Sequence, residues 1–152
     1  MVSLQDVFTL SIALSEPLEI GRTPSGFRRV IPIAGGSFRG PAARGRVLAG
    51  GADWNVVRPD GTAHLWARYT LETEDGVLIM VTNEGLRPQD AAMRECFARG
   101  QTPDPGSWYC RTTPVFEVAD GEYGWLNRSV FVGDMRPRTT AGEVVIDVHR
   151  VS

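Results

Sequence analysis

Alternation of apolar and polar residues dominates this chain and predicts a protein built from β-strands. From Phe8 to Leu14 every second residue is a large apolar one, and this period of two gives a strand one apolar face. Similar strand-like runs lie at 30–33, 46–48, 53–58, 63–73, 77–84, 109–118, 128–132 and 144–151. Gly pairs and other turn residues separate these runs, so the pattern predicts a sandwich or barrel of about eight or nine strands.

One segment has helical rather than strand periodicity. Residues 89–99 carry apolar side chains at helical spacing, with Pro88 near the start and Gly100 just after the end. A helix this short does not organise an α/β fold, so we expect it to plug one end of a barrel or to cover its mouth. The sequence therefore predicts an all-β protein, a single antiparallel β-barrel with one short helix at the barrel end. Residues 1–152 are expected to form one domain.

Composition and charge exclude several classes of partner. Hydrophobic residues make up 42% and charged residues 22% of the chain, as in ordinary globular proteins. The formal net charge is −2, which argues against a nucleic-acid partner because such proteins carry a basic field. All 16 basic residues are Arg, which excludes a Schiff-base lysine and a P-loop lysine. No apolar run is long enough for a membrane-spanning helix.

Cysteine and histidine usage predicts neither a disulfide framework nor a metal site. The chain has two cysteines, Cys96 and Cys110, and no hydrophobic signal sequence at its N-terminus. We therefore expect a reducing, cytoplasmic compartment. His64 and His149 are far apart and show no zinc-type spacing with the cysteines. No nucleophile elbow or nucleotide-binding loop is present, so no metal or cofactor is predicted.

Two Asp-Gly pairs suggest a strand register. Asp60-Gly61 and Asp75-Gly76 are typical of two-residue type I′ turns, in which both central residues have positive φ. Counting outward from these turns places Asp53 opposite Arg68, and Arg68 opposite Asn83. The more apolar face of the three strands is then expected to line the barrel, and it carries Trp54, Val56, Leu65, Ala67, Tyr69, Leu71, Leu78, Met80, Thr82 and Glu84.

The same register gathers Asp53, Arg68 and Asn83 on the other face. A charge-assisted Asp–Arg contact completed by an amide either locks three strands together or orients an oxygen atom of a ligand.

Glu84 is the candidate catalytic carboxylate. In an apolar lumen beside Tyr69 and Trp54, desolvation would raise its pKa toward the range useful for proton transfer. Tyr69 is the candidate hydrogen-bond donor, and Thr82 lies near both. The alternative places Glu84 as a rim carboxylate at a strand end.

Two further residues are candidate ligand contacts. Trp125, with Trp54, would form stacking walls for a flat ligand. Arg111 follows the long connection at 85–108 and could hold an anion or a carbonyl group; its alternative role is that of an exposed surface arginine.

Several sequence elements together resemble the DUF3237 (UPF0311) family. The most specific is Gly50-Gly51-Ala52-Asp53-Trp54, and the others are Gly21-Arg22-Thr23-Pro24, Arg29-Val30-Ile31-Pro32-Ile33 with Gly35-Gly36 and Phe38, Arg68-Tyr69-Thr70 with Asp75-Gly76, Arg111-Thr112 with Pro114 and Phe116, Trp125-Leu126 and Phe131-Val132-Gly133. The resemblance implies a calycin-like antiparallel β-barrel and no established activity. Its motif positions here are Asp53, Trp54, Arg68, Tyr69 and Trp125.

Three functions fit these features. The first is a barrel that binds a small, partly aromatic or polycyclic organic molecule and moves a proton on it, as a cofactor-independent isomerase, cyclase or lyase. The second is a carrier barrel without catalysis. The third is a structural module with a filled lumen, in which an exposed strand edge or the outer face mediates a homodimer.

Overall fold

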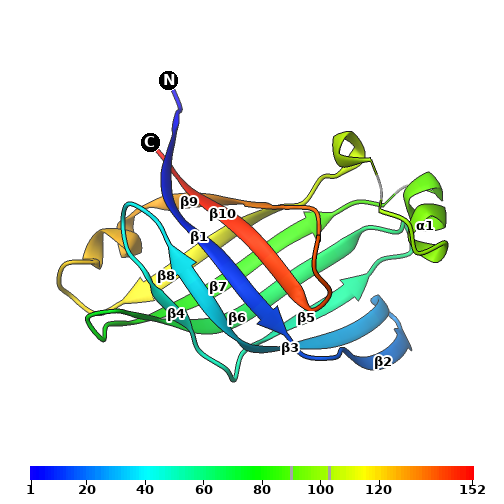
Figure 1. The fold of residues 1–152 in the computed structure, drawn as a ribbon, viewed down its shortest axis with the longest axis horizontal. Coiled ribbons are helices and arrows are strands. Elements are labelled where there is room, and N and C mark those ends of the chain that lie inside the picture. The colour runs from blue at the N-terminus through cyan, green and yellow to red at the C-terminus, as the bar shows by residue number, and fades with distance from the viewer. Residues whose placement is uncertain (90, 103) are drawn as a thin grey trace.

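The computed structural model, which describes residues 1–89, 91–102 and 104–152, confirms the all-β prediction (Figure 1). The described residues form ten strands, one α-helix and two short 3₁₀ helices. In order they are β1 (Leu4–Leu14), β2 (Leu18–Thr23), β3 (Gly26–Arg39), β4 (Gly45–Val47), β5 (Ala52–Val57), β6 (Ala63–Thr73), β7 (Leu78–Arg87), α1 (Ala91–Ala98), η1 (Pro105–Ser107), β8 (Arg111–Val118), η2 (Gly124–Arg128), β9 (Val130–Met135) and β10 (Glu143–Val151).

The strands form a closed antiparallel barrel. Around the barrel the order is β1, β10, β9, β8, β7 and β6, after which β4 and β5 both lie between β6 and β3. Pairing of β3 with β1 closes the sheet on itself. The remaining strand, β2, pairs with β3 alone and projects beyond the barrel wall (Figure 1).

The two ends of the barrel differ. At one end Phe116 packs edge to face against Phe8 and Phe131, with ring centroids 5.6 and 4.9 Å apart. Leu126 of η2 is 2% exposed and belongs to the same core. Helix α1 lies at the opposite end (Figure 1). The hydrophobic core therefore fills the η2 end, and the α1 end is left for other side chains.

The register predicted from the two Asp-Gly pairs was wrong. Asp53 and Asn83 each lie opposite Ala67, not opposite Arg68. Both connections are three-residue loops, because Arg58 N–H donates to Thr62 O and Thr73 N–H to Val77 O, each over 2.9 Å. Their glycines, with φ +84° and +86°, occupy the left-handed position that closes a type I turn with a bulge.

Because of this one-residue difference, the side chains of β5 and β7 point to the faces opposite to those predicted. The interior face of β6 was predicted correctly, with Tyr69 and Leu71 buried. On β7, however, Ile79, Val81 and Asn83 are buried, while Met80 and Glu84 are exposed. On β5 the buried polar residues are Asp53 and Asn55. The predicted lumen face of β5 and β7 is thus the outer face.

Other element boundaries differ in detail. Strand β2 was not predicted, since Gly21 interrupts its short run. The helix comprises Ala91–Ala98 rather than 89–99, and residue 90 of the predicted segment lies outside the described residues. The helix does border the barrel mouth, as expected, because Arg94 lines the cavity described next.

Candidate functional site

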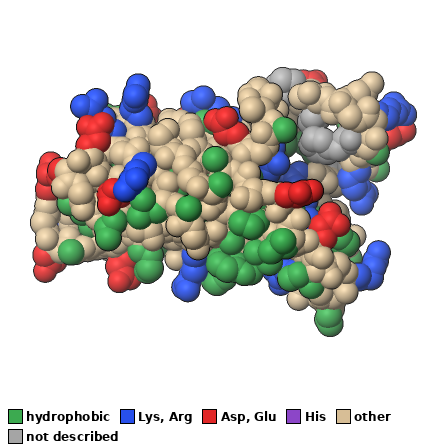
Figure 2. Space-filling view, turned by 60° about the horizontal axis from the view of Figure 1, so that its bottom comes forward, with side chains coloured by type: hydrophobic (Ala, Val, Ile, Leu, Met, Phe, Trp, Pro, Cys, Tyr) green, Lys and Arg blue, Asp and Glu red, His purple; other side chains and the backbone are tan. Residues whose placement is uncertain are grey.

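A cavity of about 550 Å³ occupies the α1 end of the barrel. Its walls are apolar side chains from β1, β3, β6 and β10, namely Ile12, Leu14, Ile31, Ile33, Leu65, Ala67, Val144 and Ile146. Residues 89, 94 and 100–102 border it beside α1. Figure 2 shows arginine side chains around a hollow at this end of the molecule. A cavity of this size in an apolar wall suits a small organic molecule.

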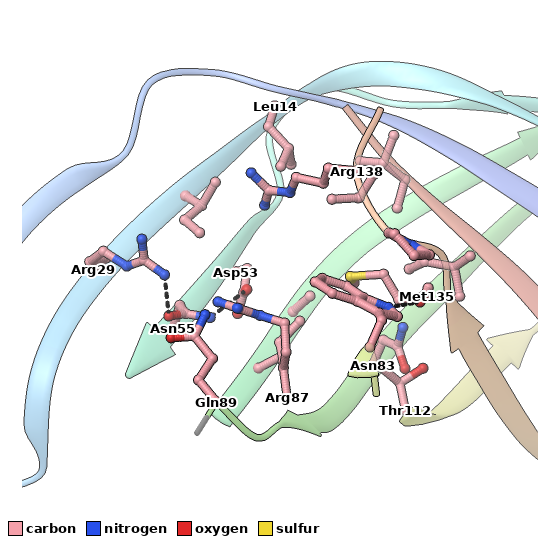
Figure 3. A pocket seen from close by; sticks show the side chains of 18 of the residues that line it. Leu14, Arg29, Asp53, Asn55, Asn83, Arg87, Gln89, Thr112, Met135 and Arg138 are labelled. Atoms are coloured by element: carbon pink, nitrogen blue, oxygen red, sulfur yellow. Dashed lines mark hydrogen bonds between the residues drawn. The ribbon is translucent and has the colours of Figure 1, made fainter. Parts of the chain in front are cut away.

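Asp53 is held inside this cavity by a chain of hydrogen bonds. Its Oδ1 accepts from the backbone N–H of Trp66 over 2.8 Å, and its Oδ2 accepts from Asn55 Nδ2 over 3.3 Å. Asn55 Oδ1 in turn accepts from Arg29 Nη2 over 3.0 Å (Figure 3). Burial raises the pKa of the Asp53 carboxyl, although these hydrogen bonds and the charge of Arg29 act in the opposite direction.

Four arginines also line the cavity, and Asp53 is the one acidic side chain among its described lining residues. The arginines are Arg29, Arg87, Arg94 and Arg138. None of the four makes an ion pair with another described residue. The cavity therefore carries an excess of positive charge inside an apolar wall, where charges are poorly screened.

Arg87 enters the cavity from the end of β7. Its guanidinium group lies 5.8 Å from the ring centroid of Trp108 and points toward Asp53 (Figure 3). Burial lowers the pKa of Arg87, and the neighbouring charges of Arg138 and Arg29 lower it further, while Cys110 and Asp53 act in the opposite direction. Burial and Arg29 likewise lower the pKa of Arg138. An anion in the cavity would relieve this mutual repulsion.

A second polar group lies on the β6–β7–β8 side of the cavity. Tyr69, Asn83 and Thr112 line it and are only 4%, 3% and 2% exposed. Asn83 and Thr112 lie together in Figure 3. Burial raises the pKa of Tyr69 far above its ordinary value, and a side-chain hydrogen bond with Asn83 acts in the opposite direction. Thr112 Oγ1 has no hydrogen-bond partner among the described residues.

Of the predicted site residues, Asp53 and Tyr69 line the cavity. Glu84 does not: it lies on the outer face, where its Oε1 is 2.7 Å from His64 Nε2. The lumen position predicted for Glu84 was therefore wrong, for the register reason given above.

The tryptophan and Arg68 predictions are corrected in the same way. Trp54 is 37% exposed and packs edge to face on Trp66, with centroids 5.7 Å apart. Arg68 lies over the outer side of Trp66, 5.1 Å from its centroid, so it does not join Asp53 and Asn83. Figure 2 shows other hydrophobic side chains exposed on the surface. Trp54, Trp66 and Arg68 therefore lie on the outer surface of the barrel and do not line the cavity.

Three remaining candidates also lie away from the cavity. Thr82 pairs with Arg68 and shares its outer face. Arg111 Nη1 donates to Asp134 Oδ1 over 2.8 Å on the outside of the barrel. Trp125 belongs to η2 and packs on Phe131, with centroids 6.0 Å apart, so it helps fill the far end.

The cavity residues that the sequence analysis missed include Arg29, Asn55, Arg87 and Arg138. Arg29 alternates with Ile31 and Ile33, which places it on their face of β3 and was a readable signal. Arg87 follows Asn83 by four residues on β7, so both side chains lie on the same face of the strand. Arg138 follows β9 in an irregular connection, and no sequence pattern points to it.

Other reactive groups do not form a site. Burial raises the pKa of the Cys110 thiol to about 11, which keeps it protonated and unreactive at neutral pH. Among the residues outside positions 90 and 103, no group of three or more His, Cys, Asp or Glu side chains is placed to hold a metal ion. No described helix is both long and apolar enough to cross a membrane.

Comparison with known proteins identifies the family. The family model for DUF3237, described as a protein of unknown function, matches residues 2–151. The chain belongs to the DUF3237 family. This DUF3237 protein is 39% identical over 145 residues to UPF0311 protein RPA1785 of Rhodopseudomonas palustris, covering 95% of the chain and 94% of the relative.

Solved structures share the barrel of this DUF3237 protein. The crystal structure of RPA1785 has a TM-score of 0.91 at 37% identity, covering 100% of this chain and 99% of that one. A beta-barrel like protein from Acinetobacter baumannii has a TM-score of 0.84 at 33% identity, covering 100% and 97%. An enzyme from Penicillium herquei has a TM-score of 0.72 at 20% identity, covering 99% and 95%, and that likeness shows the fold alone.

Proposed function

We propose that this DUF3237 barrel binds a small organic anion and moves a proton on it without a cofactor. One observation carries the proposal: among the described lining residues the cavity has a single carboxyl group, Asp53, beside arginines that form no ion pair with a described carboxylate. Guanidinium groups bind carboxylates and other planar anions through paired, charge-assisted hydrogen bonds. The positive charge of Arg29, Arg87 and Arg138 would hold the acidic group of the ligand.

Asp53 is the proposed acid and base. Its raised pKa brings the carboxyl closer to the range in which proton transfer is efficient near neutral pH. The Asp53 carboxylate would take a proton from one atom of the bound molecule and return it to another. The arginines would stabilise the negative charge that the ligand gains between the two steps. Isomerisation and cyclisation are balanced reactions of this type, and elimination follows when the ligand loses a group instead.

A non-catalytic carrier is the second candidate. Both oxygens of Asp53 already accept hydrogen bonds, from Trp66 N–H and from Asn55, as they would if Asp53 only positioned neighbouring groups. The third candidate included a filled lumen, whereas a cavity of about 550 Å³ occupies the α1 end of the barrel.

Deuterium incorporation distinguishes an enzyme from a non-catalytic carrier. Aromatic, polyketide-like and terpenoid acids, with their methyl esters, are screened by thermal shift, and the acids that bind are incubated with the protein in deuterium oxide. We expect acids to stabilise the protein more than esters do. Mass spectrometry should then show catalysed deuterium uptake that falls by about 10²- to 10⁴-fold in Asp53→Asn.

The matched control is Asp134→Asn on the outer surface, which should exchange like the wild type. Equal stabilisation by acids and esters would disprove the anion site. Tight binding without deuterium uptake by any acid would establish the carrier function.

A further inference from the structure

Three of the four cavity arginines act on one another's charge. Besides burial, the positive charges of Arg138 and Arg29 lower the pKa of Arg87. Besides burial, the charge of Arg29 also lowers the pKa of Arg138. The negative charge of Asp53 acts in the opposite direction on both groups. Three guanidinium groups therefore lie near one another around a single carboxyl group.

These three side chains enter the cavity from different parts of the barrel. Arg29 belongs to β3, Arg87 ends β7, and Arg138 lies in the connection between β9 and β10. Figure 3 shows Arg29 and Arg87 on the side of Asn55, and Arg138 on the side of Leu14. Arg29 and Arg87 are half-buried and Arg138 is exposed, so a ligand in the cavity can reach all three.

The balance of charge among these groups indicates how many negative charges the ligand carries. Even with the Asp53 carboxyl ionised, three guanidinium charges less one carboxylate charge leave two positive charges. None of the three arginines forms an ion pair with a carboxylate of the described residues. A monocarboxylate would leave one of the two charges uncompensated beside an apolar wall, where charges are poorly screened. A dianion would balance both.

We propose that the cavity takes an organic dianion whose two negative charges lie close together at one end of an apolar body. This inference rests on the proposed anion site and deepens it, because it assigns the charge of the ligand. Ile12, Ile33 and Ile146 line the wall beside the arginines and would contact the apolar body. A charge placed against these side chains would lose its hydration without compensation.

Four aromatic anions test the proposal by titration calorimetry at about pH 8, where carboxylates and phosphate monoesters are fully ionised. They are benzoate, phthalate, terephthalate and phenyl phosphate. We expect phthalate to bind about tenfold to hundredfold more tightly than benzoate, because its second carboxylate gains charge-assisted hydrogen bonds. Terephthalate should bind little more tightly than benzoate, since its ring holds the two carboxylates at opposite ends.

Phenyl phosphate distinguishes two forms of dianion. It carries both charges on one group, whereas phthalate carries them on two neighbouring groups, and both should bind more tightly than benzoate. The tighter of the two shows which form the arginines prefer.

Variants of Arg138 test the origin of the second charge contact. Arg138→Gln should remove most of the preference for phthalate over benzoate, and Arg138→Lys, which keeps the charge, should retain part of it. Arg136→Gln is the matched control, because Arg136 pairs with Asp147 Oδ2 over 2.7 Å outside the cavity; it should retain the full preference. Without ligand, the thermal midpoint of Arg138→Gln should not fall below that of the wild type, which shows that the barrel is intact.

The results distinguish the dianion from the anion site. Equal affinity for benzoate and phthalate, with both weakened by Arg87→Gln, would overturn the dianion and leave the anion site standing. Terephthalate binding as tightly as phthalate, or a phthalate preference that Arg138→Gln retains in full, would overturn the placement of both charges among these arginines. Failure of every anion to bind would overturn the anion site and the dianion together.

Discussion

The side-chain amide of Asn55 donates to Asp53 Oδ2 over 3.3 Å. The same amide accepts from Arg29 through its oxygen, over 3.0 Å. Asn55 therefore stands between the carboxyl group and the guanidinium group of Arg29 in this chain of bonds, and Asp53 and Arg29 do not form a direct ion pair. The cost of burying the carboxylate is not cancelled, and the pKa of Asp53 stays raised.

Asp53 should make the protein less stable as the pH rises. Between the ordinary pKa of 3.8 and the raised folded value, the folded protein holds a proton that the unfolded chain releases. The contribution of Asp53 is full below about pH 3.8 and is lost as the pH rises through the folded pKa. Relative to wild type, Asp53→Asn should therefore gain stability with increasing pH. Urea unfolding between pH 3 and pH 8 measures this difference.

Asp147→Asn provides a control of opposite sign. The hydrogen bond from Arg136 holds the pKa of Asp147 below its ordinary value, so Asp147 stabilises the fold at higher pH and loses this effect as the pH falls. Identical pH profiles for wild type and Asp53→Asn would show that burial leaves the Asp53 carboxyl unperturbed.

Anions should stabilise the protein through Arg87. Benzoate at low millimolar concentration should raise the thermal midpoint, since a ligand at about one hundred times its Kd stabilises by about 2.7 kcal/mol. Arg87→Gln should reduce this shift and, without ligand, raise the free energy of unfolding because it removes a cation repelled by its neighbours. Arg111→Gln, on the outer surface, should respond to benzoate as the wild type does; a shift that Arg111→Gln loses and Arg87→Gln keeps would refute the assignment.

Glu84 should be dispensable for ligand binding. Its side chain is 54% exposed and pairs with His64 outside the barrel, so Glu84→Gln should change the free energy of unfolding by no more than about 0.5 kcal/mol. Affinity for any bound acid should be unaffected. Urea unfolding of the variant checks the first statement and calorimetric titration checks the second, and a marked loss of affinity would place Glu84 at the site.

Gly76 should be difficult to replace. Its φ is +86°, and a Cβ atom there would meet nothing within 4 Å, so the effect of a substitution is one of backbone conformation alone. Gly76→Ala should cost about 1 kcal/mol of stability, and Gly76→Asn less, because asparagine tolerates this conformation better. Urea unfolding of both variants ranks them; equal stability of Gly76→Ala and wild type would contradict the three-residue loop.

The described strands other than β2 could be predicted from the sequence, but the form of the turns could not. An Asp-Gly pair suits a two-residue type I′ turn and equally a type I turn closed by a left-handed glycine. Pro59 was a usable signal, because it has no N–H with which to pair opposite Thr62 in the shorter turn. It also suits the second position of a type I turn. Around Asp75-Gly76 no residue distinguished the two forms.

The candidate site could be predicted only where it follows strand alternation. Asp53 lies within a motif and Tyr69 on an apolar face, and both line the cavity. Arg87 and Arg138 reach it from the end of β7 and from the connection after β9, far apart in the chain. Their meeting depends on how the barrel closes, which local patterns do not encode. Because β7 presents the opposite face to the one predicted, Asn83 and not Glu84 points into the lumen.

In the part of the chain that the structure describes, the aromatic packing around η2 closes one end of the barrel, so that the barrel has the form of a cup that opens at the α1 end. Two molecules cannot pass each other in such a cup, so one has to depart before the next arrives. An acidic ligand of the proposed kind would have to enter with its uncharged part ahead of the group that binds the arginines, so its orientation would be decided on entry.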